Sequence, residues 1–415
     1  MRYTDSNGTI TIFLEGRVDT SNADEIGEEL DRIIMQADKS RVTLDANALD
    51  YISSAGLRIV IKLLKTCHNL RIANASPDVY DVLQMTGLTE MMSVARRPRE
   101  VSLEGLPQIG AGAFGRVYRL DAERVAKVYD PSVNPLATIE RERQGARQAF
   151  MHGIPSAIPF DTIRAGKELG IVYELIDAQT IGEVVSASPK QVGEWGQRMA
   201  DLARLLHNTH FDESALPDAR LIFHGWIDRA ENSGLYADST ITKLREFVDA
   251  IPARDTFVHG DFHPANIMVM ADGELTLIDM GDASMGNPII DLAGMFHVIR
   301  VAARRPGGAE RLTGMTTELL DKLWDAFLRS YYDLGDKAST EEIEQRLRLY
   351  ALPRTMGSIA RTKLIDDETR KRQAHEAEQA FLATLAYPLQ ILNVKDINDV
   401  MHPLNANAME GRQAT

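Results

Sequence analysis

The stretch FVHGDFHPANIMV, residues 257–269, places several polar side chains inside an otherwise apolar strand pattern. Asp261 is followed five residues later by Asn266, and Asp279 stands thirteen residues beyond Asn266. This order of carboxylate, amide and carboxylate is the one that phosphoryl transfer requires. One Asp accepts the proton of the attacking hydroxyl, while the Asn and the other Asp hold Mg²⁺ on the phosphates. A polar turn with a helix cap is the structural alternative for the stretch taken alone, so the flanking sequence has to decide.

A glycine-rich stretch, QIGAGAFGRVYRL, lies upstream and could cover bound phosphates. Gly110, Gly112 and Gly115 form the pattern G-x-G-x-x-G, and Val117 extends it. The pattern alone also fits a dinucleotide-binding loop, but that loop stands between a strand and a helix. Here strand-forming residues continue on both sides. The sequence therefore predicts strand, glycine loop, strand, turn and strand, which is a hairpin that folds over phosphates.

Lys127 lies on the third of these strands, between apolar neighbours and twelve residues after Gly115. A lysine whose stem packs on the strand while its amine reaches water is the structural alternative. The position would also let Lys127 reach phosphates beneath the glycine loop, and it would then need an acidic partner. The following helix offers Glu140 and Glu142. Because residues two apart lie on opposite helix faces, only one of them can face Lys127, and we favour Glu142.

The segment GIVYELIDAQTIGEVV is an apolar strand that ends in polar residues, which suits a connector between two lobes. Its backbone from Glu174 to Ile176 could hydrogen-bond the edge of an adenine, although a strand leading into a helix without a ligand stays open as an alternative. The glycine loop, the lysine, the helical glutamate, H-G-D-x-x-x-x-N and I-D-x-G occur in this order along one chain. Since each motif supplies the context that the others need, the set predicts an ATP- and Mg²⁺-dependent phosphotransferase.

Residues from about 107 to 400 resemble the aminoglycoside phosphotransferase and choline kinase branch of the protein-kinase-like fold. The resemblance rests on four segments of the sequence: LARLLHNTH at 202–210, HGDFHPAN at 259–266, IDMGD at 278–282 and GNPIIDLAGM at 286–295. It implies roles for the following residues: Asp261 as the catalytic base, Asn266 and Asp279 as metal ligands, Lys127 with Glu142 on the nucleotide phosphates, His259 and Asp291 as supports of the catalytic loop, and His207 as a packed helix residue.

The sequence also departs from protein kinases in three ways. Gly260 replaces the usual arginine of the catalytic loop, and Met280 replaces the usual phenylalanine of the metal-binding tripeptide. Only eleven residues separate Asp279 from Asp291, which is too few for a long activation segment. Control by phosphorylation of such a segment is therefore not expected.

Residues from about 9 to 95 alternate between strand and helix patterns, which predicts a small layered α/β domain. The segment LDYISSAGLRIVI, residues 49–61, resembles the phosphoacceptor turn of STAS domains, the anti-sigma-factor-antagonist fold. The resemblance implies a regulatory or interaction domain, and it points to Ser54 as a candidate phosphoacceptor. Ser53 stands where that family commonly has an Asp. Helix capping by Ser53 or Ser54 is the alternative explanation for a serine there.

The expected fold is therefore an α/β STAS-like domain followed by an α+β, two-lobed protein-kinase-like domain with a mostly helical C-lobe. The predicted boundaries are 1–95 for the first domain, 96–106 for a linker, 107–176 for the N-lobe, 177–402 for the C-lobe and 403–415 for a disordered tail. The phosphate acceptor is either a protein serine or a small-molecule hydroxyl. Two alternatives stay open: a small-molecule kinase of the aminoglycoside or choline type with the STAS domain as a targeting module, and a non-catalytic protein that binds nucleotide.

Composition bounds these interpretations. The 415 residues are 44% hydrophobic, which is enough for two or three domains with real cores. The single cysteine, Cys67, excludes a disulfide framework and fits a reducing compartment. The N-terminus lacks a signal-peptide pattern, and no apolar run approaches the roughly 18 residues of a spanning helix. A net charge of −14 argues against nonspecific nucleic-acid binding. We therefore expect a cytoplasmic protein with ATP and Mg²⁺ as cofactors, a protein partner for the STAS domain, and neither membrane nor nucleic acid.

Overall fold

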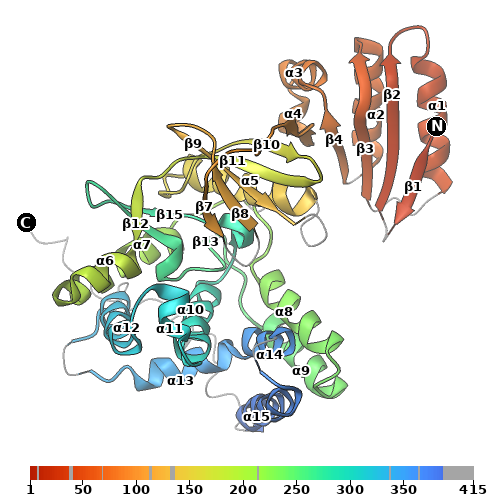
Figure 1. The fold of residues 1–415 in the computed structure, drawn as a ribbon. Helices are drawn as coiled ribbons and strands as arrows, with labels where there is room; N and C mark the ends of the chain where they lie inside the picture. The colour runs from red at the N-terminus through yellow and green to blue at the C-terminus, as the bar shows by residue number, and fades with distance from the viewer. Residues whose placement is uncertain are drawn as a thin grey trace, which may run out of the picture. The chain divides into compact units, whose positions relative to one another are not determined.

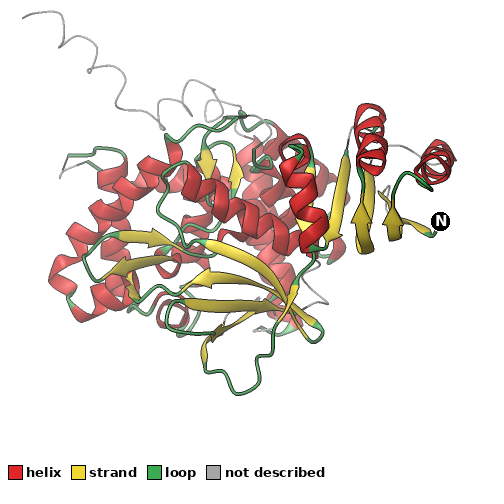
Figure 2. Ribbon diagram, turned by 90° about the horizontal axis from the view of Figure 1, so that it is seen from above, coloured by secondary structure: helices red, strands yellow, loops and turns green. Residues whose placement is uncertain are grey.

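The computed structural model of the chain describes residues 1–6, 9–36, 41–67, 69–111, 115–130, 136–212, 215–335, 338–362 and 365–386. Gly112 of the predicted glycine loop and the predicted tail 403–415 lie outside these residues. The chain divides into two compact units, whose elements are drawn in Figures 1 and 2. Unit 1 comprises Met1–Glu140 and Phe160–Tyr173, and unit 2 comprises Arg141–Pro159 and Glu174–Thr415.

The N-terminal domain of unit 1 is built on a five-stranded sheet of order β1-β2-β3-β4-β5. Its strands are Tyr3–Ser6, Thr9–Val18, Arg41–Ile52, Leu70–Ala75 and Ser93–Arg96. β1 runs antiparallel to β2, and the remaining pairs are parallel. Parallel neighbours need crossover connections, and these contain α1 (Ala23–Gln36), α2 (Ser54–Thr66), α3 (Pro77–Met85) and α4 (Leu88–Met91). The predicted α/β class of this domain is confirmed.

The start of α2 is packed tightly on the sheet. A Cβ atom at Gly56 would lie 2.7 Å from Ile52 Cγ1 and 2.8 Å from Val18 Cγ1. Both of these residues are buried at the ends of β3 and β2, within one continuous core. Glycine is therefore required at this position, and the close approach fixes the first turn of α2 against the strand ends.

The second part of unit 1 is a six-stranded sheet of order β6-β10-β11-β9-β8-β7. In chain order its strands are Arg99–Glu100, Gln108–Ala111, Gly115–Arg119, Arg124–Tyr129, Pro159–Ala165 and Glu168–Glu174. The first and last residues of the β10–β11 pair, Pro159 and Glu174, are assigned to unit 2. β7, β8 and β9 are consecutive antiparallel strands, as the sequence predicts for the glycine-loop hairpin.

Part of the segment predicted as a linker, 96–106, belongs to this sheet. β6 pairs in parallel with β10, with Arg99 opposite Ile163. Val101 and Leu103, which follow β6, pack against the buried residues of the sheet. The chain therefore enters the second domain as an edge strand several residues earlier than the sequence pattern indicates.

Unit 2 is mainly helical (Figure 2). α7 (Val192–His207) packs on α12 (Thr317–Tyr331), while α8 (Arg220–Asn232) packs on α9 (Asp238–Asp249) and on α14 (Leu352–Arg361). The other helices are the C-terminal part of α5 (Leu136–Met151), α6 (Ile181–Ala187), α10 (Ile289–His297), the π-helix η4 (Val298–Ala302), α11 (Gly308–Thr313), α13 (Glu341–Tyr350) and α15 (Asp367–Ala386). None of the described helices combines the length and apolar character needed to cross a bilayer.

Two small sheets interrupt these helices. β12 (Ala178–Thr180), β14 (Ile267–Met270) and β15 (Leu275–Leu277) form one, and β13 (Phe257–Val258) pairs with β16 (Ser284–Met285) in the other. β13 and β16 stand immediately before and shortly after the motif residues of 259–282, whereas β14 and β15 lie within them.

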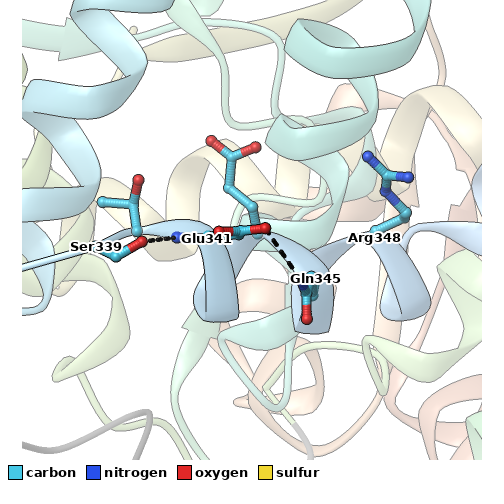
Figure 3. Close-up of a pocket in the computed structure, with 6 residues that line it drawn as sticks. Ser339, Glu341, Gln345 and Arg348 are labelled. Carbon is cyan, nitrogen blue, oxygen red and sulfur yellow. Dashed lines mark hydrogen bonds between the residues drawn. The ribbon is translucent and has the colours of Figure 1, made fainter.

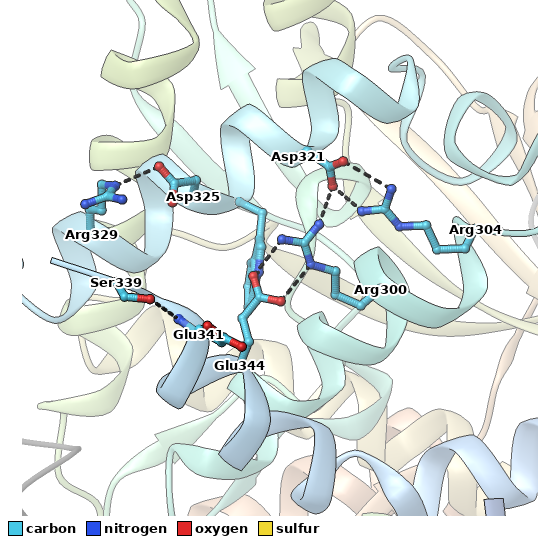
Figure 4. Close-up of polar contacts among 9 residues, drawn as sticks. Arg300, Arg304, Asp321, Asp325, Arg329, Ser339, Glu341 and Glu344 are labelled. Atoms are coloured by element: carbon cyan, nitrogen blue, oxygen red, sulfur yellow. Dashed lines mark hydrogen bonds and ion pairs between the residues drawn. The ribbon is translucent and has the colours of Figure 1, made fainter. Parts of the chain in front are cut away.

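A polar network joins η4 to α12 and α13 (Figure 4). Arg300 donates from Nε and Nη2 to the two carboxylate oxygens of Glu344 at 3.1 and 2.6 Å, and it also donates to Asp321. Trp324 Nε1 donates to the same glutamate at 3.0 Å. Because two-pronged arginine–carboxylate pairs constrain geometry as well as charge, this network fixes the angle between the three helices.

Candidate active site

The β14–β15 hairpin brings two motif residues to one place. Ile267 pairs with Leu277 in an antiparallel register, so Asn266 lies opposite Ile278. The Ile278 N–H donates to the Asn266 carbonyl at 3.1 Å, which extends the pairing by one step. Asp279 follows directly. The hairpin thus places Asn266 and Asp279 at the same end of two paired strands, although thirteen residues separate them.

Asn266 closes the catalytic loop onto Asp261. The Asn266 side chain is buried, and its Nδ2 donates to the Asp261 carbonyl at 2.9 Å and to the Asp261 carboxylate at 3.3 Å. Since Nδ2 makes both bonds, Oδ1 of the same amide is directed away from Asp261. This amide oxygen and the Asp279 carboxylate are hard donors of the kind that Mg²⁺ prefers. The residues present therefore fit the predicted metal.

Asp291 supports the loop from beneath and is completely buried. Its Oδ2 accepts from the His259 N–H at 2.8 Å, and its Oδ1 accepts from the Gly260 N–H at 2.6 Å. His207 Nε2 lies 3.2 Å from Oδ2, and His207 Nδ1 lies 2.8 Å from the Tyr331 hydroxyl. Three donors thus converge on one carboxylate if His207 carries its proton on Nε2. Asp291 thus holds the backbone at 259–260, and His207 is buried against it.

His259 links the two halves of the motif. Its ring is completely buried, with Nε2 3.1 Å from the Ile278 carbonyl, and its Nδ1 accepts from the Asp261 N–H at 3.2 Å. The next residue, Gly260, has φ of 81°. A Cβ atom there would lie 2.5 Å from Asp282 Cβ and 2.7 Å from the Asp282 carbonyl. The position that is usually arginine in protein kinases therefore admits only glycine in this chain.

Arg354 contacts the predicted base, and the sequence analysis did not identify it. One guanidinium nitrogen lies 2.5 Å from Asp261 Oδ1, and another lies 3.4 Å from the Gly260 carbonyl. His263 Nε2 is 3.4 Å from Asp261 Oδ2. Burial alone would raise the pKa of Asp261, but the charge of Arg354 and the contribution of His263 outweigh it and hold that pKa well below its usual value. Arg354 lies in a helical stretch without a recognisable motif, so no signal in the sequence could have found it.

Asp279 occupies a strained part of the hairpin end. Its φ and ψ are 64° and 63°, the left-handed region that non-glycine residues rarely adopt. The turn that follows, η3 (Met280–Asp282), packs against α5, where a Cβ atom at Gly145 would lie 2.7 Å from Ala283 Cβ. Glu142 on the same helix is 5% exposed, and its Oε2 is 3.5 Å from the Cβ position of Gly281. The structure therefore places Glu142 beside the turn that carries Asp279.

Asp282 is the last residue of the same turn. The pKa of Asp282 is raised, first by partial removal from water within the site and then by the negative charges of Asp261 and Asp279. Three carboxylates are therefore close enough to affect one another. Positive charge from a metal ion or from arginine would relieve this repulsion.

Glu140 and Glu142 face different neighbours, as their spacing predicts. The Glu140 carboxylate accepts a hydrogen bond from the hydroxyl of Thr162 on β10, whereas Glu142 is buried beside Gly281. Lys127 belongs to unit 1 and Glu142 to unit 2. The pairing of Lys127 with Glu142 stays a prediction.

The described glycine-loop residues and Lys127 lie on adjacent strands of unit 1. Val117 of β8 is opposite Gly110 of β7 on one side and opposite Lys127 of β9 on the other. The apolar neighbours of Lys127 are buried, and its Nζ lies 5.2 Å from the Tyr129 ring centroid. A Cβ atom at Gly115 would lie 2.4 Å from the Val128 carbonyl oxygen, so this glycine is required by close strand packing.

The predicted adenine-binding connector begins where β11 ends. The Glu174 N–H donates to the Ile158 carbonyl at 3.1 Å, and the Glu174 carboxylate accepts from the Ile158 N–H at 2.7 Å. Ile176 follows between β11 and β12, outside regular structure. Because the Glu174 N–H is already bonded, an adenine contact here would use the Glu174 carbonyl or the backbone at 175–176. The contact itself stays a prediction.

The two serines at the start of α2 have different environments. Ser53 is the N-cap, and its hydroxyl accepts from the N–H groups of Ala55 and Gly56 at 3.2 and 3.5 Å. Ser54 is the first helical residue, and its side chain is exposed. Capping therefore accounts for Ser53 and does not account for Ser54.

A cavity of about 480 Å³ lies at the start of α13 (Figure 3). It is lined by Ser339, Thr340, Glu341, Glu344, Gln345 and Arg348. None of these residues belongs to the motifs described above. The Glu344 carboxylate already accepts a hydrogen bond from Arg300, and the Glu341 carboxylate accepts one from Gln345. We assign this cavity no part in the reaction.

Comparison with known families accounts for both domains. Residues 105–333, more than half of the chain, match the phosphotransferase enzyme family. The chain belongs to this family. Residues 1–101 match the STAS domain. BtrV of Bordetella bronchiseptica, named as an anti-sigma factor antagonist, is 35% identical over 95 residues, which cover 21% of this chain and 79% of BtrV. The N-terminal domain of this phosphotransferase-family chain is thus a STAS domain, as predicted.

Solved structures of aminoglycoside phosphotransferases resemble the chain at low identity. The ADP-bound structure of APH(2'')-Ib is 15% identical, covers 72% of this chain and 97% of that chain, and has a TM-score of 0.44. APH(3'')-Id from Streptomyces rimosus is 18% identical, covers 66% of this chain and 98% of that chain, and has a TM-score of 0.41. These similarities carry no information on the acceptor that this phosphotransferase uses.

Proposed function

We propose that this STAS-containing phosphotransferase transfers the γ-phosphate of ATP to a hydroxyl group and depends on Mg²⁺. The observation that supports this best is the arrangement around the catalytic loop. The Asn266 amide donates a hydrogen bond to the Asp261 carboxylate. Buried Asp291 accepts hydrogen bonds from the two backbone N–H groups that precede Asp261. A turn with only a structural role would not need the Asp261 carboxylate, whose side chain is 27% exposed, next to the buried Asn266 amide. Asp261 and Asn266 together suit a base next to a metal ligand.

Each residue would then have a distinct task. The Asp261 carboxylate would accept the proton of the acceptor hydroxyl as that oxygen attacks the γ-phosphorus. Asn266 Oδ1 and the Asp279 carboxylate would hold Mg²⁺, which when bound offsets the negative charge of the phosphates. Lys127, positioned by Glu142, would orient the phosphates. The β7–β8 hairpin with Gly110, Gly112, Gly115 and Val117 would cover them, and the connector at Glu174 and Ile176 would contact the adenine.

Ser54 is a second candidate acceptor because its exposed hydroxyl is not used in capping. A phosphate there would add about −1.5 to −2 charges at the start of α2, where the helix dipole favours negative charge. Tethering of both domains on one chain would raise the effective concentration of Ser54 at the active site. Phosphorylation would then change the surface that a protein partner of the STAS domain contacts.

A labelled-ATP experiment tests the transfer and separates the two acceptors. The purified protein is incubated with labelled ATP and Mg²⁺, alone and with small alcohols, choline and aminoglycosides. We expect transfer that stops when Mg²⁺ is chelated. If Ser54 is the acceptor, the intact mass rises by one phosphate in the wild type and in Ser53→Ala but not in Ser54→Ala. Label that appears only in a small molecule would favour the small-molecule kinase, and the absence of label in every acceptor would contradict the proposed function.

The two glutamates of α5 provide an internal comparison. We expect Glu142→Gln to lower the transfer rate about tenfold or more, which corresponds to about 1.4 kcal/mol in the barrier, because buried Glu142 lies beside the Asp279 turn and is the predicted partner of Lys127. Glu140→Gln is the matched control and should have a much smaller effect, since Glu140 is bonded to Thr162. Steady-state rates of the two variants decide this, and the reverse ranking would show that the wrong face of α5 was chosen.

A further inference from the structure

The catalytic loop borders a wall formed by α8 and α14. On α8, Ile222 Cδ1 is 2.8 Å from the Cβ position of Gly260, so this helix abuts the loop. On α14, Arg354 contacts Asp261 directly. The two helices also touch each other closely, because a Cβ atom at Gly357 would lie 2.4 Å from the Trp226 carbonyl oxygen. These contacts all lie within unit 2, so the wall and the predicted base form one packed assembly.

The wall concentrates guanidinium groups around Trp226. Arg229 follows Trp226 by three residues on α8, and its Cζ lies 4.2 Å from the Trp226 ring centroid. Arg354 approaches the same ring, with Cζ at 5.5 Å. Arg361 lies seven residues after Arg354 and so on the same face of α14. The pKa of Arg229 is lowered, first by burial and then by the positive charge of Arg361, while the negative charge of Asp282 acts in the opposite direction.

The described acidic groups near the wall leave the Arg229 guanidinium group without an ion-pair partner. Asp261 is paired with Arg354, and Asp228 is paired with Arg245 at 2.8 Å. Asp282 lies close enough to Arg229 and Arg354 to act on their charges, but among the described residues it forms an ion pair with neither of them. Among the residues that the structure describes, no carboxylate forms an ion pair with Arg229. The Arg229 guanidinium group therefore stays available to an anion near the predicted base, although the whole chain carries a net charge of −14.

A neighbouring histidine does not add to the positive charge of the wall. His297 of α10 is buried next to Arg354, and burial followed by the charge of Arg354 holds its pKa well below the usual value. Its ring is therefore uncharged at neutral pH and adds neither positive nor negative charge to the wall.

We propose that the wall of α8 and α14 binds an anionic group, a carboxylate or a phosphate, on the hydroxyl compound that accepts the phosphoryl group. This inference rests on the proposed function, because it places the acceptor at Asp261. The anion would bind Arg229 and compete with Asp261 for Arg354, which leaves the Asp261 carboxylate available to the hydroxyl proton. The acceptor oxygen then forms a bond to the γ-phosphorus, the bond to ADP breaks, and the proton passes to Asp261.

The same geometry disfavours a cationic group at the wall. An ammonium group bound between Arg229 and Arg354 would lie beside two guanidinium groups, and like charges repel most where water is partly excluded. Planar guanidinium groups instead match carboxylate and phosphate oxygens in two-pronged hydrogen bonds. The guanidinium groups of the wall, rather than the net charge of the chain, decide which substituent of the acceptor binds there.

Binding measurements can test whether the wall binds anions, and they do not depend on phosphoryl transfer. Glycerol 3-phosphate and glycerate serve as anionic hydroxyl probes, glycerol as the neutral probe and choline as the cationic probe. Each is titrated by calorimetry into the full chain with Mg²⁺ and a non-hydrolysable ATP analogue. We expect the two anions to bind more tightly than glycerol and choline. Arg229→Gln should weaken anion binding roughly ten- to a hundredfold, the loss expected for a charge-assisted hydrogen bond, and should leave binding of the ATP analogue unchanged.

Arg198→Gln is the matched control. Arg198 on α7 also stacks on a tryptophan, with Cζ 4.8 Å from the Trp195 ring centroid, but it donates to the Gly273 carbonyl at the far end of the β14–β15 hairpin. This variant should keep wild-type affinity for the anions. Choline binding as tight as the anions, no binding of either anion, or equal weakening by both arginine variants would each overturn the inference. Anion binding without phosphoryl transfer to any acceptor would support the wall and count against the proposed function.

Discussion

Asp261→Asn is expected to lower the rate of phosphoryl transfer by about 10²–10⁴-fold, the usual contribution of a general base. The amide has nearly the same size as the carboxylate but cannot take up the proton of the acceptor hydroxyl. Asn266 can still donate to the carbonyl of residue 261, so the loop should keep its shape. Nucleotide binding should therefore be retained. Single-turnover rates and nucleotide titrations measure the two effects separately.

Two further variants show whether the effect belongs to the base. Asp272→Asn makes the same chemical change in the exposed β14–β15 turn, where Asp272 accepts only from the Glu274 N–H among the hydrogen bonds of the described residues, and it should leave the rate unchanged. Asp279→Asn should weaken Mg²⁺-dependent nucleotide binding as well as transfer, because it removes the carboxylate that is proposed to bind Mg²⁺. Wild-type turnover in Asp261→Asn would refute the assignment of the base.

Secondary structure and motif order could be predicted from the sequence, because each motif is formed by residues that are close together in the chain. The βαβ pattern of the first domain follows from short apolar periods between turn residues, and the structure confirms that class. A common location for Asn266 and Asp279 was implied by their predicted role as metal ligands, and the β14–β15 hairpin brings them to the same end of two paired strands. Support by Asp291 was implied by family resemblance, and Asp291 accepts hydrogen bonds from the N–H groups of His259 and Gly260.

Other features depend on tertiary packing, which periodicity does not encode. Arg354 reaches Asp261 from 93 residues away because α14 lies against α8 through the glycine at 357. A helical arginine with no motif around it gives no hint of such a contact. The left-handed conformation of Asp279 is likewise a property of the turn and its packing on α5 rather than of the residue type.

The edge strand β6 is also a feature that the pattern of apolar residues does not predict. Arg99 and Glu100 are both charged and exposed, so they carry no alternation of polar and apolar residues. The pairing of this strand with β10 is made by backbone groups and is invisible in side-chain type. A two-residue strand of this kind reads as a linker in any analysis that depends on hydrophobic period.

Asp291→Asn should both destabilise unit 2 and reduce activity. The buried carboxylate accepts from two backbone N–H groups, and an asparagine would turn an NH₂ group toward one of these donors or toward His207. Loss of a charged acceptor and an unsatisfied buried donor together cost about 2–4 kcal/mol. Urea unfolding of the full chain measures this loss. Asp325→Asn is the control, since it breaks only the more exposed pair with Arg329 seen in Figure 4, and it should cost no more than about 1 kcal/mol.

The effect of Asp291→Asn on activity has a separate cause. The two N–H groups that Asp291 holds immediately precede Asp261, so their release lets the base move relative to the acceptor. A displacement of about 1 Å at a reacting group can cost about 10²-fold in rate. Activity is therefore measured at a temperature where unfolding curves show the variant to be folded. A folded variant with wild-type turnover would show that Asp291 stabilises the fold without positioning the base, whereas a folded variant with a slow transfer step and normal nucleotide binding would show that the buried carboxylate sets the geometry of catalysis.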